Sequence, residues 1–362
     1  MLYHLLYPLH KYFFAFNVLR YITFRAGGAA LTALVLGIVL GPIIIRKLQA
    51  ANIGDTIREF PLFEQQHQKK AGTPTMGGLI IISVIVISTL LWARLDNSFI
   101  HLLLLTTVYL AAAGFLDDYL KVKNKKPRGL TGMQKLIIQA VLGVAIGLYL
   151  YQFPLTKDFS SITVPFLKDI FLKLGVVYIF FVAFVIMASS NAVNLTDGLD
   201  GLAIGGVIVV AGTMGLFSYV TGHLKFSQYL LIPYVPLAGE VSVYLAGMVG
   251  AGLGFLWFNS YPSQVFMGDT GALALGGAIG LVSILIRKEF VLIIVGGIFV
   301  LETVSVILQV LSFKLTKKRI FKMTPLHHHF ELSGWAEPKV VVRFWIINII
   351  LALISLSTLK LR

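Results

Sequence analysis

Long apolar runs dominate this chain and restrict what it can fold into. We count ten such runs of about 20 residues, the length that an α-helix needs to cross a bilayer: 23–45, 75–93, 98–116, 133–151, 174–190, 202–221, 238–257, 270–286, 290–311 and 340–359. With 57% hydrophobic and only 13% charged residues, the composition is not that of a soluble domain. We therefore predict an all-α polytopic integral membrane protein with about ten transmembrane helices, in which residues 1–362 form a single domain.

The segment before the first run has a different character. Residues 1–22 mix aromatic side chains with basic ones such as His10 and Arg20, which favours an interfacial amphipathic helix leading into the first span. No short hydrophobic region with a small-residue cleavage site is present, so we expect no removable signal. The chain contains no cysteine, which excludes disulfides, thiolate chemistry and cysteine-ligated metals.

The net charge of +14 is typical of contact with anionic lipid at the cytoplasmic side of a bilayer, and we expect no nucleic acid partner. If both termini lie outside, the connections 46–72, 117–132, 191–201, 258–269 and 314–339 are cytoplasmic, and they hold the larger share of the 30 lysines and arginines. The unusual polar residues fall on this same side: Asp117, Asp118, Asp197, Asp200, Asp269 and His327–His329. We therefore predict a site on the cytoplasmic face.

The stretch from Asn191 to Gly201 places four polar side chains between two apolar runs. Their spacing of three, which keeps helical neighbours roughly on one face, relates Asn191, Asn194, Asp197 and Asp200. Two amides and two carboxylates beside a membrane cost free energy unless they have a function. A polar turn with helix caps is the alternative, and it accounts for one Asn and one Asp only.

Carboxylates occur at two further places. Asp117 and Asp118 follow an apolar run directly, and their mutual repulsion suits a general base or a shared metal site. A juxtamembrane acidic pair that answers Lys121 and Lys123 is the alternative. Asp269 lies among glycines at the start of a predicted helix, where an N-cap and an oxygen ligand for Mg²⁺ are both open interpretations.

Three consecutive histidines, His327, His328 and His329, lie inside the chain. Consecutive residues of a helix point about 100° apart, so they cannot all bind one ion. We favour contact with phosphate oxygens over exposed interfacial histidines. Lys70 precedes a glycine-containing turn that ends at Gly78, and such a turn can offer a cation and backbone N–H groups to phosphate.

Two features inside the runs have simpler interpretations. Glu302 lies within the ninth run, far along the chain from the cytoplasmic residues, and we interpret it as a hydrogen-bonded structural partner. Gly247, Gly250, Gly252 and Gly254 superficially resemble a nucleotide-binding loop. Because no strand precedes them, close helix packing is the better explanation.

Taken together, the motifs resemble those of the phospho-N-acetylmuramoyl-pentapeptide-transferases, a family within the polyprenyl-phosphate N-acetylhexosamine-1-phosphate transferases. The similar segments, in chain order, are 70–78, 114–121, 191–201, 254–271 and 325–330. The resemblance implies transfer of phospho-MurNAc-pentapeptide from UDP-MurNAc-pentapeptide to undecaprenyl phosphate, giving lipid I and UMP for peptidoglycan synthesis. It also implies Mg²⁺, a homodimer, and a place in the bacterial inner (cytoplasmic) membrane.

The resemblance further implies roles for single residues. Asp269 would hold Mg²⁺ against the diphosphate, and Asp117 would deprotonate or orient the lipid phosphate with Asp118 beside it. Whether an aspartate forms a covalent intermediate or the lipid phosphate attacks directly stays open. Asn194, Asp197 and Asp200 would line the uridine side, and Phe266 could stack on uracil. Lys70 and Lys135, with the expected catalytic histidines His327, His328 and His329, would answer phosphate charge. Asn191 and Asn259 are further expected substrate-binding residues.

Two other functions compete with this one. A related transferase that uses UDP-GlcNAc shares the same chemistry. A membrane transporter should place ionisable groups near the midplane between inverted repeats. In this chain only Glu302 lies clearly deep within a run, and no convincing internal repeat accompanies it.

Overall fold

A computed structural model describes residues 1–51, 72–124, 129–154, 160–163 and 171–360. The chain begins with three short helical pieces, α1 (Leu2–Leu6), η1 (Tyr7–Lys11) and η2 (Phe14–Arg20). The longer helices are α2 (Ile22–Ala50), α4 (Gly78–Trp92), α5 (Ser98–Asn124), α6 (Gly132–Gln152), α7 (Val177–Thr196), α8 (Leu202–Thr221), α10 (Ala238–Asn259), α11 (Gly268–Leu285), α13 (Gly297–Thr316) and α15 (Glu337–Ser357). Short elements connect them: β1 (Ser161–Thr163), β2 (Phe171–Lys173), α9 (Leu224–Leu230), α12 (Glu289–Val295), α14 (Leu326–Glu331) and η4 (Thr358–Lys360).

The predicted class of an all-α polytopic membrane protein is confirmed. Among the described residues, nine helices are long and apolar enough to cross a bilayer, and α4 is a shorter apolar helix of 15 residues. The predicted run 290–311 is not one helix, because α12 ends at Val295 and α13 begins at Gly297. Glycine is a poor helix former, and the pair Gly296–Gly297 marks the break.

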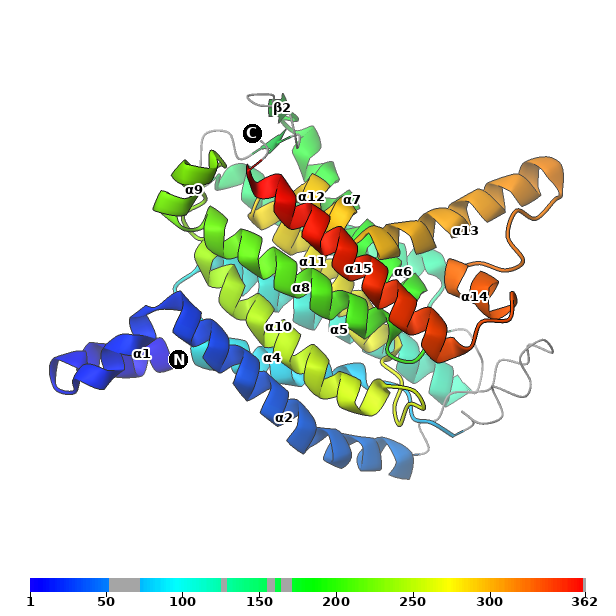
Figure 1. The fold of residues 1–362 in the computed structure, drawn as a ribbon, viewed down its shortest axis with the longest axis horizontal. Coiled ribbons are helices and arrows are strands. Elements are labelled where there is room, and N and C mark those ends of the chain that lie inside the picture. Colours follow the sequence, from blue (N-terminus) through cyan, green and yellow to red (C-terminus); the bar gives the residue numbers. More distant parts are fainter. Residues whose placement is uncertain (52–71, 125–128, 155–159, 164–170, 361–362) are drawn as a thin grey trace.

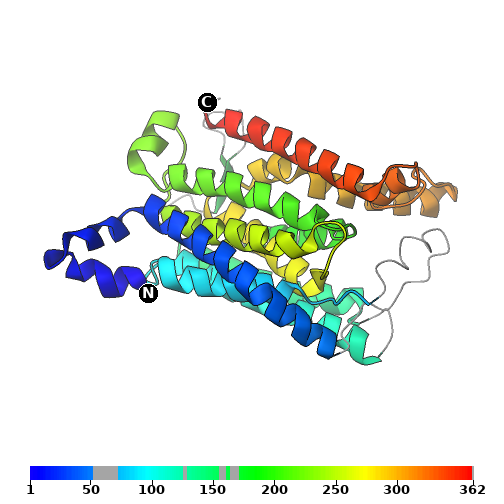
Figure 2. The same cartoon turned by 60° about the horizontal axis from the view of Figure 1, so that its bottom comes forward.

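The prediction of one amphipathic helix for residues 1–22 is wrong. The segment consists of α1, η1 and η2, which lie to the side of the bundle at the blue end of the chain (Figures 1 and 2). Pro8 lies at the start of η1 and has no N–H to donate, so the α-helix cannot continue through it. An extended Phe13 then separates η1 from η2.

The centre of the bundle is α11, in which every residue from Thr270 to Leu285 is buried. Its sequence is rich in glycine and alanine, which lets neighbouring helix backbones approach closely where no solvent is present. The glycines of α10 have the predicted packing role. An added Cβ at Gly254 would lie 3.0 Å from the Leu34 carbonyl oxygen and 3.1 Å from the Gly37 Cα of α2.

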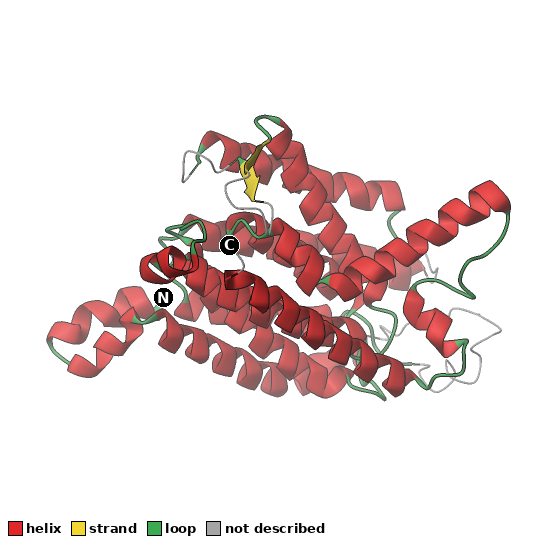
Figure 3. Cartoon of the chain, turned by 45° about the horizontal axis from the view of Figure 1, so that its top comes forward, coloured by secondary structure: helices red, strands yellow, loops and turns green. Residues whose placement is uncertain are grey.

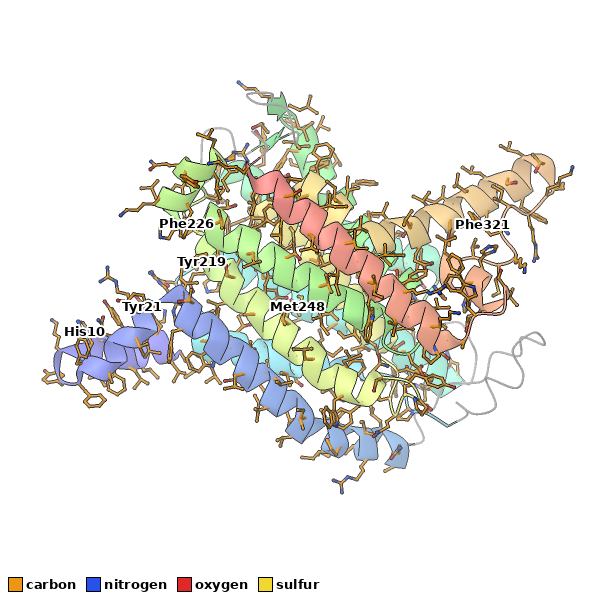
Figure 4. All side chains as sticks on the ribbon, viewed as in Figure 1. His10, Tyr21, Tyr219, Phe226, Met248 and Phe321 are labelled. Atoms are coloured by element: carbon orange, nitrogen blue, oxygen red, sulfur yellow. The ribbon has the colours of Figure 1, made fainter. Side chains whose placement is uncertain are left out.

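The long helices alternate in direction, so their ends gather in two groups. Near the right-hand end of Figure 1, the ends of α2, α5, α7 and α10 meet the starts of α4, α6, α8, α11 and α15. The β1–β2 hairpin, which pairs Ile162 with Leu172, lies at the other end, away from α14 (Figure 3). Figure 4 shows Met248 of α10 within the bundle and Phe321 beside α14.

The helix α13 diverges from the rest of the bundle (Figures 1 and 3). Its buried residues, Ile298, Phe299, Glu302 and Ser305, all belong to its first half. The connection after α13 folds back, and α14 returns the chain to the bundle before α15 begins.

Candidate active site

Three aspartates from two helices come together where α5 ends and α11 begins. One carboxylate oxygen each from Asp117, Asp118 and Asp269 can be chosen so that all lie within 4.8 Å of one another. Asp117 and Asp118 are buried, and the side chain of Asp269 is 13% exposed. The prediction that these residues share one site is therefore consistent with the fold.

Two lysines enter the same group of carboxylates. Lys121 Nζ lies 2.6 Å from Asp117 Oδ2 and 3.4 Å from Asp269 Oδ2. Lys135 Nζ lies 2.9 Å from Asp117 Oδ2 and also contacts Asp269 Oδ2. We call Asp117, Asp118, Asp269, Lys121 and Lys135 the carboxylate–lysine cluster. It holds formally three negative and two positive charges, so ammonium groups and carboxylates face one small volume.

Local sequence explains how Lys121 and Lys135 reach the cluster. Lys121 stands four residues after Asp117 on α5, and this spacing places two side chains on one helix face. The start of α6 is set by a capping box, in which Thr131 and Gln134 bond each other's backbone N–H groups. Lys135 is the next residue after Gln134, so the capping box places it near the start of α6. The alternative interpretation, an acidic pair that answers Lys121 and Lys123, is confirmed for Lys121 only. Lys123 is exposed and lies over the Tyr119 ring.

Asp118 bonds to the backbone of α11 rather than to the lysines alone. Its Oδ2 accepts hydrogen bonds from the Thr270 N–H at 3.0 Å and the Thr270 hydroxyl at 2.8 Å. Its Oδ1 accepts from the Asp269 N–H at 3.3 Å. Gly268 has φ +72°, and a Cβ there would lie 2.6 Å from Asp118 Oδ2, so glycine is required for this approach.

The segment before α4 pairs with the segment before α11. Phe266 N–H donates to the Pro74 carbonyl at 2.9 Å, and Gly77 N–H donates to the Phe266 carbonyl at 2.8 Å. Gly78 N–H donates to the Met267 carbonyl at 2.8 Å. The amides of Gly77 and Gly78 are thus used inside the protein and are not available to phosphate, while the expected role of the rest of the turn stays a prediction. Lys70 lies outside the described residues.

The four polar residues of the Asn191–Gly201 stretch do not share one face. The Asn191 side chain donates to Gln139 Oε1 at 2.7 Å and links α7 to α6. Asn194 is half-buried near the end of α7, and Asp197 follows as its C-cap residue. Because α7 ends at Thr196, the helical spacing of three does not continue to Asp200.

Asp197 faces the carboxylate–lysine cluster. Burial and the nearby carboxylates of Asp269 and Asp118 raise the pKa of Asp197 to about 8. A carboxyl group with this pKa is mostly protonated at neutral pH, and a cation bound beside it would lower the pKa again. Asp197 thus belongs to the same electrostatic environment as the three aspartates.

Asp200 and Asn259 connect the loop after α7 to the loop before α11. Asp200 Oδ2 accepts from the Ser263 N–H at 3.1 Å. Asn259 Oδ1 accepts from the Gly201 N–H at 3.0 Å, and its amide donates to the Val265 carbonyl at 2.9 Å. These bonds fix the loop that carries the half-buried Phe266.

The histidine triplet lies on α14, and its three rings have different partners, as the 100° rotation per residue predicts. His327 is buried, and its Nδ1 lies 3.2 Å from Glu302 Oε1. His328 Nδ1 lies 2.8 Å from Glu331 Oε2, and His329 Nδ1 accepts from the Lys322 N–H at 3.2 Å. His327 lies against the loop after α7, because a Cβ at Gly198 would clash with its ring.

Glu302 is correctly interpreted as a hydrogen-bonded partner, but it is not far from the site residues. Its Oε1 also accepts from the His327 N–H at 3.2 Å. The distance along the chain misled the prediction, because the fold-back after α13 returns α14 to the first half of that helix.

The carboxylate–lysine cluster suits a divalent metal ion. Its acidic members offer only carboxylate oxygens, which are the ligands that hard cations such as Mg²⁺ prefer. The oxygens are within one ion's reach of one another and largely shielded from solvent. The residues present therefore fit a metal ion of this class.

Sequence reasoning missed four residues that hold the site together. Lys121 was considered only as a surface partner, although its i, i+4 spacing from Asp117 was visible. Thr270, Gln139 and Glu337 had no signal of their own. Thr270 bonds Asp118, Gln139 bonds Asn191, and Glu337 Oε1 accepts from the Asp200 N–H at 3.0 Å.

Comparison with known proteins gives two kinds of match. The family model described as glycosyl transferase family 4 matches residues 100–287, and the phospho-N-acetylmuramoyl-pentapeptide-transferase signature 1 matches residues 70–82. Two relatives, from Geobacter sp. and Citrifermentans bemidjiense, are each named phospho-N-acetylmuramoyl-pentapeptide-transferase. Each is 54% identical to this chain over 364 aligned residues, covering 100% of both sequences.

Proposed function

The chain belongs to the phospho-N-acetylmuramoyl-pentapeptide-transferases, and from that premise we propose which of its residues carry the reaction. The enzyme transfers phospho-MurNAc-pentapeptide from UDP-MurNAc-pentapeptide to undecaprenyl phosphate, which gives lipid I and UMP. An oxygen of the lipid phosphate forms a bond to the phosphorus that bears the sugar, and the bond from that phosphorus to the UMP oxygen breaks. The observation that carries the proposal is the carboxylate–lysine cluster at one end of the bundle.

Transfer between two anionic phosphates depends on positioning and on neutralising charge. Asp117 and Asp269, which share the two lysines, would hold Mg²⁺. When bound, the ion would supply positive charge that offsets the negative charge gained by the UMP oxygen as its bond to phosphorus breaks. Lys121 and Lys135 touch the same carboxylates, so their ammonium groups are within reach of the same phosphates.

Asp117 is the residue we assign to the lipid phosphate. Its Oδ1 accepts from the Leu130 N–H at 2.7 Å, while its Oδ2 faces Lys121 and Lys135. A carboxylate held by two cations and a backbone amide is well suited to orienting an incoming group. Its place at the end of α5, a membrane-spanning helix, is where the head group of a lipid in the bilayer would arrive.

The nucleoside side is proposed to lie across the loops after α7 and before α11. Asp197 lies close enough to the cluster for the charges of Asp269 and Asp118 to act on it, and Asn194 lies in the last turn of α7 just before it. Asp200 holds the loop in which Phe266 could present its ring to uracil. His327 lies against the loop after α7 and, with Glu302 behind it, would contact phosphate. His328, His329, Asn191 and Lys70 keep their expected substrate roles as predictions.

We propose that the site end of the bundle faces the cytoplasm. The described lysines and arginines of that end include Lys47, Lys121, Lys135 and Lys318, and basic residues collect on the cytoplasmic side of membrane proteins. The homodimer rests on the family resemblance alone, and native mass spectrometry of the purified protein would test it.

The decisive assay is release of UMP by purified protein given undecaprenyl phosphate, Mg²⁺ and either UDP-MurNAc-pentapeptide or UDP-GlcNAc. Turnover only with the muramoyl substrate supports the proposal; turnover only with UDP-GlcNAc would contradict it. Lys121→Gln should reduce turnover about ten- to hundred-fold, the scale for a lost hydrogen bond to a charged group. Lys123→Gln, on the exposed face of the same helix, is the matched control and should leave turnover unchanged.

A further inference from the structure

The three aspartates of the cluster are not equivalent in their hydrogen bonds. Asp117 and Asp269 each direct Oδ2 toward both lysines. Asp118 Oδ2 instead receives the N–H and the hydroxyl of Thr270, at 3.0 and 2.8 Å. Within the described part of the chain, Asp118 has one lysine contact, with Lys121 at 3.5 Å on its other oxygen.

The bonds to Asp118 fall where a helix needs them. The first N–H groups of an α-helix have no partner within the helix. The N-cap residue of α11 is Met267, whose side chain makes no capping bond. Asp118, from α5, takes that place by accepting the N–H groups of Asp269 and Thr270. Its negative charge also lies at the positive end of the helix dipole.

The hydroxyl of Thr270, on α11, holds the carboxylate of Asp118, on α5, in this position. Thr270 is fully buried and Asp118 is 2% exposed, so water does not compete for these bonds. The Thr270 hydroxyl spans the gap between α11 and the end of α5, and its neighbour in sequence is Asp269. Any rotation of the first turn of α11 would therefore move the Asp269 carboxylate relative to Asp117.

We propose that Thr270 and Asp118 are positioning residues, which set the distance between the Asp117 and Asp269 carboxylates by capping α11 from α5. The inference rests on the proposed metal-binding role of Asp117 and Asp269. It assigns Asp118 a different task from its two neighbours, although all three belong to one cluster. Thr270 acts through Asp118 and touches neither substrate nor metal.

The test compares Thr270→Val, which removes the hydroxyl and keeps the shape, with Thr270→Ser, which keeps the hydroxyl. Thr213→Val is the matched control, because the one bond of the Thr213 hydroxyl to a described residue goes to the Val209 carbonyl of its own helix, α8. Mn²⁺ binding to each purified, substrate-free protein is measured by electron paramagnetic resonance. Thermal unfolding, the half-saturating Mg²⁺ concentration, kcat, and KM for UDP-MurNAc-pentapeptide are measured on the same preparations.

We expect Thr270→Val to weaken Mn²⁺ binding and raise the half-saturating Mg²⁺ concentration, each by about tenfold. Its kcat should fall about ten- to hundred-fold, with KM for the UDP substrate within about threefold of wild type. Thr270→Ser should stay within about threefold of wild type in every measurement, and Thr213→Val should match wild type in metal binding.

Two results would overturn the proposal. If Thr270→Val unfolds at a lower temperature but binds Mn²⁺ as wild type does, Thr270 supports the fold and not the site. If it binds Mn²⁺ more tightly, the released Asp118 is itself a ligand. Should Thr270→Val not accumulate, Thr270→Ala replaces it in the same titration and is judged by the same two criteria. A wild-type protein that releases UMP but binds no Mn²⁺ would instead contradict the metal-site proposal, which separates the two failures.

Discussion

Replacing Asp269 by Asn removes one charge from the carboxylate–lysine cluster while keeping the shape of the side chain. Asp269 Oδ2 lies 3.4 Å from Lys121 Nζ and contacts Lys135. At an effective dielectric constant of about 20, two unit charges at this distance attract by about 5 kcal/mol. Most of this attraction is offset in the folded protein, because Asp117 and Asp118 repel the same carboxylate.

The balance of charge decides the expected effect on stability. The cluster changes from three carboxylates and two ammonium groups to two of each, so the variant is formally neutral. We therefore expect its thermal midpoint to stay within about 2 °C of wild type, since about 1 kcal/mol corresponds to 2–4 °C even in a smaller domain. Folding should survive while function is lost.

The expected effect on activity is large, because an amide oxygen is a poor substitute for an anionic ligand of Mg²⁺. A loss of about 3 kcal/mol, the upper value for hydrogen bonds to charged groups, corresponds to more than a hundred-fold in rate. The assay is UMP release over a range of Mg²⁺ concentrations, with unfolding followed by differential scanning fluorimetry. Asp96→Asn is a control, since Asp96 pairs with Arg94 on an exposed turn between α4 and α5.

Near-normal activity of Asp269→Asn, with an unchanged dependence on Mg²⁺, would refute this reasoning. The metal would then be held without Asp269, by Asp117 or Asp118. A variant that fails to fold would contradict the charge balance instead, because it would show that the Asp269 charge stabilises the resting protein.

Three other predictions concern the division of labour and the orientation of the chain. Asp200→Asn should weaken binding of a nucleotide ligand in calorimetry, whereas Asp117→Asn should spare that binding and reduce turnover; equal loss of binding in both would refute the division. Among the histidines, His327→Gln should cost about ten- to more than hundred-fold in activity, and His329→Gln should stay within about tenfold; three mild results, His328→Gln included, would return the triplet to an interfacial role. A reporter fused at Lys318 should read cytoplasmic, and an outside signal there would reverse the proposed topology.

Fold class was predictable because membrane insertion depends on local composition. Each apolar run meets the length requirement by itself, so most helix bounds agree with the runs to within a few residues, as for α8 and α10. Breaks inside a run were not visible in this way. The average hydropathy of 290–311 is high throughout, and only the backbone conformation at Gly296–Gly297 divides it.

The sequence predicted which aspartates belong to the candidate site, but not how their side chains are arranged. Asp117, Asp118 and Asp269 are identified by their unusual positions at the ends of apolar runs. The sequence does not identify their different tasks, because a carboxylate that caps a helix and one that faces a lysine belong to the same residue type. Thr270, whose hydroxyl gives Asp118 its different task, has nothing in the sequence that distinguishes it from other threonines.

The sequence by itself determined the class of the fold, the approximate bounds of most apolar helices and the positions of the unusual polar residues at the ends of apolar runs. These follow from the cost of leaving polar groups in hydrocarbon, a property of each segment alone. Only the tertiary structure decided which groups meet. Glu302 reaches His327 because the chain folds back after α13, and Asp118 reaches Thr270 because small residues let α5 and α11 pack closely. Hydrogen bonds and ion pairs act over a few ångströms. The spacing of two residues along the chain does not predict whether the fold brings them within that distance.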